Sequence, residues 1–162
     1  MTFKLTSASF QDGDTLPDLH VKAMGDTSPH LRWSGAPAGT RSFAITCYDP
    51  DAPTGSGFWH WTVANIPADV TELPAGAGSR DGRDLPPGAV QGRTDYGYAG
   101  FGGAAPPPGH GPHRYIFTVF AVDTDKLEVG PDDSGAIYGF NLHFHTLAKA
   151  SITATYENRG EG

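Results

Sequence analysis

The feature that most constrains how this chain can fold is a set of short segments in which side chains alternate with a period of two. In residues 42–48, Phe43, Ile45 and Cys47 fall on one face of an extended backbone and the intervening residues on the other. Residues 114–122 are apolar on both faces and rich in β-branched and aromatic residues, which is typical of a central strand. Further strands are predicted at residues 60–66, 151–157, 3–6 and 30–33.

Glycine and proline separate these segments. The chain has 22 glycines and 14 prolines without a fixed period, which predicts an all-β protein with long loops. Residues 71–112 are mostly glycine, proline and polar residues and are too long for a plain connection, so we expect them to fold back over a site or a sheet edge. At 162 residues the chain is expected to form a single domain spanning residues 1–162.

One helix is predicted near the end of the chain, at residues 133–148. Candidate capping residues lie at positions 132–134. Gly139 costs on the order of 1 kcal/mol relative to alanine inside a helix, so packing of an apolar stripe must supply most of the stability. The residues of that stripe, at helical spacing, are Ile137, Phe140, Phe144 and Leu147.

Charge and composition exclude several classes of partner. The formal net charge of −7 argues against nucleic acid or an anionic membrane surface as the main partner, because both require a basic footprint. No stretch of about 18 apolar residues is present, so stable membrane insertion is not expected. Cys47 is the only cysteine, which rules out an intramolecular disulfide and favours a cytoplasmic location.

The first motif with chemical potential is Asp49-Pro-Asp-Ala-Pro53, which follows the strand at 42–48. His60 begins the next strand eleven residues after Asp49, and functional residues often gather where strands hand over to loops. The two carboxylates and the histidine can bind a metal, act as acid and base, or cap turns. Asp-Pro sequences form turns readily, so the structural interpretation stays open beside the functional ones.

The second motif is the proline-rich segment 106–115, which leads into the central strand. Alternation places His113 and Tyr115 on the same face and Arg114 on the other. His113 and Tyr115 then share one wall of a pocket, whereas we expect Arg114 to pair with a carboxylate elsewhere. Taken alone, His113 is equally well explained as a hydrogen-bonded core histidine.

Other chemistries have weaker support. A zinc site needs Asp49, His60, His110 and His113 to converge, and their spacing matches no known zinc pattern. Cys47 alternates with apolar neighbours, which predicts an inert buried thiol. No glycine run has the context of a phosphate-binding loop. The enzyme alternative that stays open is a metal-assisted hydrolase that uses Asp49, His60 and His113.

Four segments of the chain form a recognisable set. They are Ser28-Pro-His-Leu-Arg-Trp-Ser34, Tyr48-Asp-Pro-Asp-Ala-Pro53, Phe58-Trp-His-Trp-Thr-Val-Ala-Asn-Ile-Pro67 and Pro106-Pro-Pro-Gly-His-Gly-Pro-His-Arg-Tyr115. Together they resemble the phosphatidylethanolamine-binding protein family, and the short helix followed by one strand resembles its bacterial Raf kinase inhibitor-like branch. The similarity covers nearly the whole chain.

The resemblance implies a β-sandwich of antiparallel sheets with a small cavity for phosphate or phosphoryl groups. No dedicated nucleophile is visible in the sequence, which favours a ligand-binding protein, without cofactor or metal, over an enzyme. The family name suggests regulation of a partner protein by kinase inhibition, although no residue identifies a kinase as the partner. The resemblance also implies a cis Ala52–Pro53 bond. Two departures from the family pattern, Ala104-Ala105 and Phe144, are expected to reshape the cavity rim. The cavity residues that the family pattern matches are Asp49, His60, Pro107, His113 and Tyr115.

Physical chemistry is consistent with this expectation. Imidazoles donate N–H bonds, and near their ordinary pKa of ~6.5 they also carry charge, so His60 and His113 can hold an oxyanion inside an acidic protein. An ionised Asp49 repels phosphate, so we expect it to orient a histidine or to share a proton with the ligand. Phosphate binding should then weaken at high pH.

A homodimer is the expected assembly. Several aromatic side chains in the loops and strand ends are predicted to be exposed and to form either a pocket rim or an interface. These residues are Phe58, Trp59, Tyr96, Tyr98 and Phe101.

Overall fold

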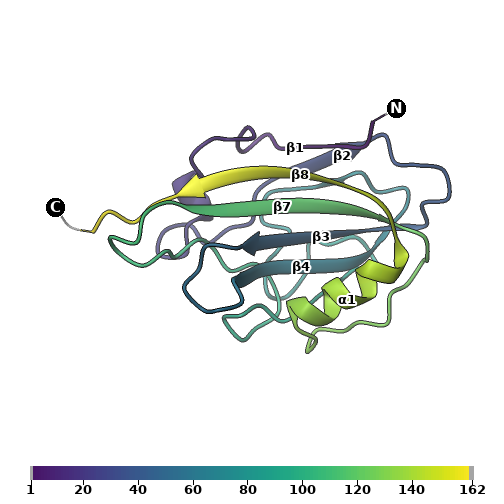
Figure 1. Cartoon of the computed structure of the whole chain (residues 1–162). Helices are drawn as coiled ribbons and strands as arrows, with labels where there is room; N and C mark the ends of the chain where they lie inside the picture. Colours follow the sequence, from purple (N-terminus) through teal and green to yellow (C-terminus); the bar gives the residue numbers. More distant parts are fainter. Residues whose placement is uncertain (1, 161–162) are drawn as a thin grey trace.

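The computed structural model describes residues 2–160 and consists mainly of antiparallel β-strands (Figure 1). Its larger sheet contains five strands in the order β6-β4-β3-β7-β8, and every neighbouring pair is antiparallel. The strands of this sheet are β3 (Ser42–Asp49), β4 (Phe58–Pro67), β6 (Val90–Gln91), β7 (His113–Val122) and β8 (Thr146–Tyr156).

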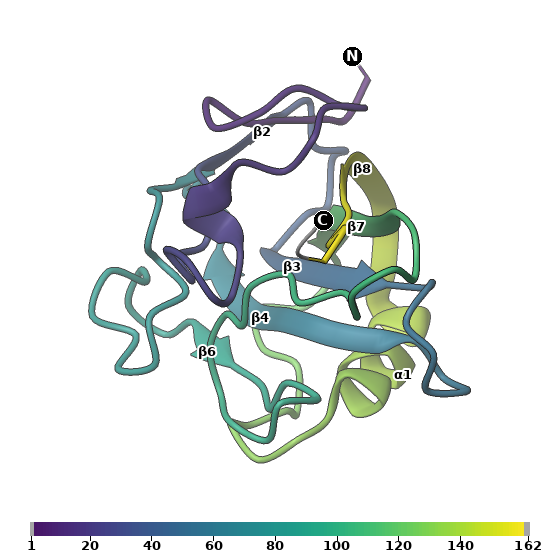
Figure 2. The same ribbon diagram turned by 90° about the vertical axis from the view of Figure 1, so that its left-hand side faces the viewer.

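A smaller sheet covers one face of the larger sheet. It has three antiparallel strands in the order β1-β2-β5. Figure 2 shows β2 on one side of β3 and β4 and the helix α1 (Gly135–His145) on the other. A short 3-10 turn, η1 (Asp18–His20), follows β1 in the chain. The strands of the smaller sheet are β1 (Lys4–Thr6), β2 (Leu31–Ser34) and β5 (Glu72–Leu73).

The core follows the alternation in the sequence. Phe43, Ile45 and Cys47 of β3 are buried in the main cluster, together with apolar residues of β1, β2, β4 and β7. Ala44, on the opposite face of β3, belongs to a second cluster beneath α1. The predicted β-sandwich is therefore confirmed, and β7 lies inside the sheet between β3 and β8. None of the helices within residues 2–160 is long and apolar enough to cross a membrane.

The helix forms near the predicted place, but the prediction of its buried face is wrong. It buries Gly135, Tyr138 and Leu142. The Tyr138 hydroxyl donates to the Gly130 carbonyl at 3.0 Å, and Gly135 lies so close to Trp59 that a Cβ there would be 2.2 Å from the indole. The side chains of the predicted stripe stay exposed: Ile137 by 44%, Phe140 by 65%, Phe144 by 62% and Leu147 by 45%.

The helix is also shorter than predicted, because its last predicted residues belong to β8. Thr146 ends the helix, with both its backbone N–H and its hydroxyl directed to the Leu142 carbonyl. It is already paired with Val122 of β7. Ser134 caps the other end by accepting a hydrogen bond from the Ile137 N–H at 3.3 Å.

Residues 71–112 fold back along an edge of the larger sheet and onto the cavity described below, in agreement with the prediction of a site or a sheet edge. Within them, β6 extends the sheet beside β4, and the Gln91 side chain accepts a hydrogen bond from the Trp61 indole at 2.8 Å. The peptide bond before Pro53, in the loop at 52–57, was expected to be cis. The described residues contain no cis peptide bond, so Ala52–Pro53 is trans.

Candidate functional site

A cavity of about 230 Å³ lies at one end of the larger sheet. The antiparallel register explains its position, because Asp49 at the end of β3 pairs with Phe58 at the start of β4, and Tyr48 pairs with Ile116 near the start of β7. The five residues matched by the family pattern all line this cavity: Asp49, His60, Pro107, His113 and Tyr115. The other lining residues are Ala52, Pro53, Thr54, Phe58, Tyr96 and Ala105.

Asp49 and His113 form a buried pair in the cavity wall. The distance from His113 Nδ1 to Asp49 Oδ2 is 2.6 Å, and both side chains are at most 3% exposed. Because a carboxylate oxygen accepts, Nδ1 of His113 carries the hydrogen atom and donates it. The other carboxylate oxygen of Asp49 accepts the backbone N–H of Asp51 at 2.8 Å. Asp49 therefore orients His113, as expected from the sequence.

The second ring nitrogen of His113 is also engaged. Its Nε2 lies 2.6 Å from Nδ1 of His110, whose ring meets that of His113 edge to face. Asp49, His113 and His110 thus form a continuous hydrogen-bonded row. Sequence analysis considered His110 only as one ligand of a zinc site, because its contact with His113 depends on the conformation of the loop at 106–112.

His60 was expected to donate a hydrogen bond to a ligand, but the nitrogen that it leaves free is an acceptor. Its Nδ1 donates to the Gly102 carbonyl at 2.8 Å, and burial lowers the pKa of His60, so the ring is neutral near pH 7. In a neutral imidazole with hydrogen on Nδ1, Nε2 is an acceptor. The expectation that a neutral His60 donates to an oxyanion is therefore wrong, and a ligand must bring a hydrogen atom to this nitrogen.

Tyr115 supplies the donor. Its side chain is 1% exposed, and its hydroxyl is buried without a hydrogen-bond partner among residues 2–160. Burial, reinforced by the negative charge of Asp49, raises the pKa of Tyr115, so the hydroxyl keeps its hydrogen atom. The Tyr115 ring contacts His60 edge to face, with 5.2 Å between ring centroids. The two rings therefore lie side by side, and both residues line the cavity.

Arg114 points away from the cavity, as the alternation predicts. It forms two side-chain hydrogen bonds with Asp51, at 2.9 and 3.0 Å, and its backbone N–H donates to the same carboxylate. The Arg114 guanidinium lowers the pKa of Asp51 to about 2. This exposed ion pair ties the loop after β3 to the start of β7, and thereby holds Asp49 and His113 in register.

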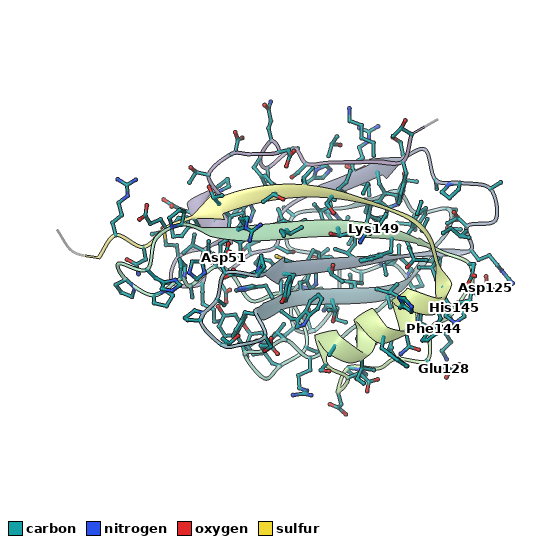
Figure 3. All side chains as sticks on the ribbon, viewed as in Figure 1. Asp51, Asp125, Glu128, Phe144, His145 and Lys149 are labelled. Atoms are coloured by element: carbon teal, nitrogen blue, oxygen red, sulfur yellow. The ribbon has the colours of Figure 1, made fainter. Side chains whose placement is uncertain are left out.

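The two departures from the family pattern lie in different places. Ala105 lines the cavity, and Ala104 is buried against the turn at 20–22, where its backbone N–H and carbonyl bond to His20 and Lys22. Phe144 lies on the exposed face of α1, at the opposite end of the sheet from Asp51 (Figure 3). The expectation that Phe144 reshapes the cavity rim is wrong.

Of the five aromatic residues expected to form either a pocket rim or an interface, two line the cavity and none is exposed. Phe101 is buried, and Phe58 and Tyr96 pack against His60 as part of the cavity wall. Trp59 and Tyr98 are half-buried. Exposed apolar surface gathers instead on α1 and the start of β8, so the homodimer stays a prediction without the interface that the sequence suggested.

The residues of the metal alternative are engaged with one another or with the backbone. Asp49 and His113 form a direct hydrogen bond, and His60 is directed to the Gly102 carbonyl. Within residues 2–160 no group of three or more histidine, cysteine or acidic side chains is placed to hold a metal ion. Cys47 is buried as predicted, and burial raises the pKa of its thiol.

Comparison with known proteins agrees with the fold and the motifs. The family model described as "Phosphatidylethanolamine-binding protein" matches residues 6–157. The chain belongs to this family. It is 56% identical to YbcL of Escherichia coli over 160 residues, which cover 96% of this chain and 87% of YbcL. It is also 56% identical to YbhB of Escherichia coli, over 94% of this chain and 99% of YbhB.

Solved structures of the family share the architecture. The crystal structure of Escherichia coli YbcL, described as a new member of the mammalian family, superposes with a TM-score of 0.94 and covers 96% of this chain and 98% of its own. CT736 from Chlamydia trachomatis, at 28% identity, has a TM-score of 0.82 over 96% of this chain and 97% of its own. The resemblance found in the sequence motifs is confirmed.

Proposed function

We propose that this protein binds a small phosphoryl group or a similar oxyanion in the cavity, and that it acts as a binding protein rather than as an enzyme. The observation that carries the proposal is the unpartnered hydroxyl of Tyr115 beside His60 in the cavity. A buried hydroxyl without a partner costs about 1–3 kcal/mol. A ligand oxygen that accepts from Tyr115 removes this cost.

The pair of groups favours a ligand with both an accepting oxygen and a hydroxyl. Tyr115 donates, whereas Nε2 of the neutral His60 accepts. Phosphate and phosphomonoesters in their singly ionised form carry both kinds of group on one phosphorus atom. The lipid in the family description, phosphatidylethanolamine, contains a phosphodiester. Its phosphoryl oxygens can accept from Tyr115, but it has no hydroxyl on phosphorus for His60, so it supports phosphoryl recognition in general and the hydroxyl requirement favours phosphate or a phosphomonoester.

The overall charge does not prevent such binding. The formal net charge is −7, so attraction must come from local groups. Asp49 is the nearest carboxylate in the wall, and its oxygens are occupied by His113 and by the Asp51 N–H. These hydrogen bonds offset its repulsion toward an oxyanion at short range.

Isothermal titration of inorganic phosphate and of phosphoethanolamine tests the proposal. Tyr115→Phe removes one oxygen atom from the cavity and is expected to weaken binding about tenfold, which corresponds to ~1.4 kcal/mol. Tyr138→Phe is the matched control, because it removes a buried hydroxyl that bonds to Gly130 beneath α1. Absence of heat in the wild-type titration, with folded protein, would reject the proposal.

A further inference from the structure

His113 has no free ring nitrogen with which to hold a ligand. Its Nδ1 is 2.6 Å from Asp49 Oδ2, and its Nε2 is 2.6 Å from His110 Nδ1. Each imidazole nitrogen carries either one hydrogen atom or one lone pair, so each makes one strong in-plane hydrogen bond. A ligand oxygen can therefore bond to His113 only after Asp49 or His110 has left.

The two partners of His113 differ in how firmly they are held. Asp49 is 2% exposed and also accepts the Asp51 N–H. His110 is exposed, and its own Nε2 has no hydrogen-bond partner among residues 2–160. Its contact with His113 is the weaker restraint, so His110 is the partner that can be exchanged.

The loop around His110 allows the exchange. Gly109 and Gly111 flank it with φ angles of 74° and 93°, a region open to glycine at little cost, and no atom lies within 4 Å of the place of a Cβ on either. The Gly109 N–H is anchored on the Asn158 carbonyl at 2.8 Å. The His110 N–H also donates to the Pro107 carbonyl at 3.2 Å, so both bonds hold the loop backbone while the side chain of His110 can turn outward by rotation about its χ1 bond.

We propose that His110 is an internal competitor of the ligand, bonded to His113 Nε2 in the free protein and displaced when a hydroxyl group of singly ionised phosphate takes the same position. This competition rests on the proposed function, and it regulates ligand binding at the same site. His113 lines both the cavity and a neighbouring surface hollow that is also lined by His110. Its ring can therefore contact either a ligand in the cavity or His110.

The exchange preserves the hydrogen-bonding pattern. Because Nδ1 of His113 donates to Asp49, its Nε2 accepts, and Nδ1–H of His110 is the donor in the free protein. A ligand hydroxyl that replaces His110 donates to the same Nε2. The other charged groups nearby, Asp51 and Arg114, stay paired with each other. The ligand therefore replaces His110 as the donor to His113 Nε2, and the Asp51–Arg114 ion pair is not broken.

Titration of inorganic phosphate into a double-mutant cycle tests the proposal. His110→Ala is expected to bind phosphate about fivefold more tightly than the wild type, a change that corresponds to the ~1 kcal/mol of one net hydrogen bond. The gain should vanish when His110→Ala is combined with His113→Ala, because the competition acts through His113. His143→Ala, an exposed histidine on α1, is the matched control and should leave the affinity unchanged.

The outcomes separate this proposal from the proposed function. Unchanged or weaker binding by His110→Ala, with clear binding by the wild type, overturns the competitor and leaves the phosphate site standing. No binding by any variant overturns both. Imidazole ¹⁵N signals of the free protein give an independent measurement: His110→Ala must shift those of His113, and an unchanged spectrum contradicts the contact. If His113→Ala does not fold, the phosphate affinity of His110→Ala and these ¹⁵N signals together still test the proposal.

Discussion

Tyr115 and His60 both line the cavity, one as a hydrogen-bond donor and the other as an acceptor. The hydroxyl of Tyr115 donates, and Nε2 of His60 accepts because its Nδ1–H is fixed on the Gly102 carbonyl. Alternation in the sequence placed His113 and Tyr115 on one face and Arg114 on the other. It could not assign the hydrogen atom on His60, because the carbonyl that fixes it belongs to a loop 42 residues further along the chain.

Phosphate affinity should fall as the pH rises from 6 to 8. Burial lowers the pKa of His60 below its usual value of ~6.5, so the ring is neutral over most of this range and then brings no hydrogen atom to the ligand. A phosphomonoester loses its last hydroxyl hydrogen near pH ~6 and then cannot donate to His60. Titration calorimetry of phosphoethanolamine at several pH values checks this. An affinity that grows in proportion to the dianion contradicts the assignment.

The free energy of unfolding should fall as the pH is lowered from 7 to 5. Burial lowers the pKa of both His20 and His60 in the folded protein, so the unfolded chain takes up protons first. Their stabilising contribution is complete above the unfolded value of ~6.5 and is lost as the pH falls through the folded values. Asp51, with a pKa of about 2, stays ionised throughout.

Urea denaturation at pH 7 and pH 5 measures this loss. His20→Asn is the control, since its amide can donate to the Thr27 carbonyl, as His20 does, but does not titrate. It should lose less stability on acidification than the wild type. An equal loss would mean that His20 does not contribute to the acid sensitivity.

At the scale of elements, the site depends on the register of three strands. The end of β3 meets the starts of β4 and β7, which places the two sequence motifs at one end of the sheet. The strands were predictable because their alternation is strong. The buried face of α1 was not, because it is decided by the close approach of Gly135 to Trp59 rather than by the spacing of apolar residues.

Two glycines of α1 should respond to alanine in opposite directions. Gly139 faces open space, with no atom within 4 Å of the place of a Cβ, so Gly139→Ala should stabilise the protein by ~0.5–1 kcal/mol. Gly135→Ala puts a Cβ 2.2 Å from Trp59 and should destabilise it by ~1–3 kcal/mol. Urea midpoints of the two variants check the pair, and equal effects would contradict the packing of α1.

In the whole molecule, the proposed binding site occupies one end of the larger sheet. The cavity lies at the end where Asp51 is found, and the exposed apolar side chains of α1 lie at the other (Figure 3). Composition predicted that an anion must be held by local groups, because the chain carries a net charge of −7. It could not predict the contact of His110 with His113, which depends on a loop conformation set by glycines.

A crystal structure of the protein soaked in phosphate would show whether Tyr115 and His60 hold the ligand. We expect phosphate in the cavity, with one oxygen within hydrogen-bonding distance of the Tyr115 hydroxyl and another facing Nε2 of His60. His110 should be turned away from His113. An empty cavity, at a phosphate concentration that saturates the protein in solution, would contradict the account.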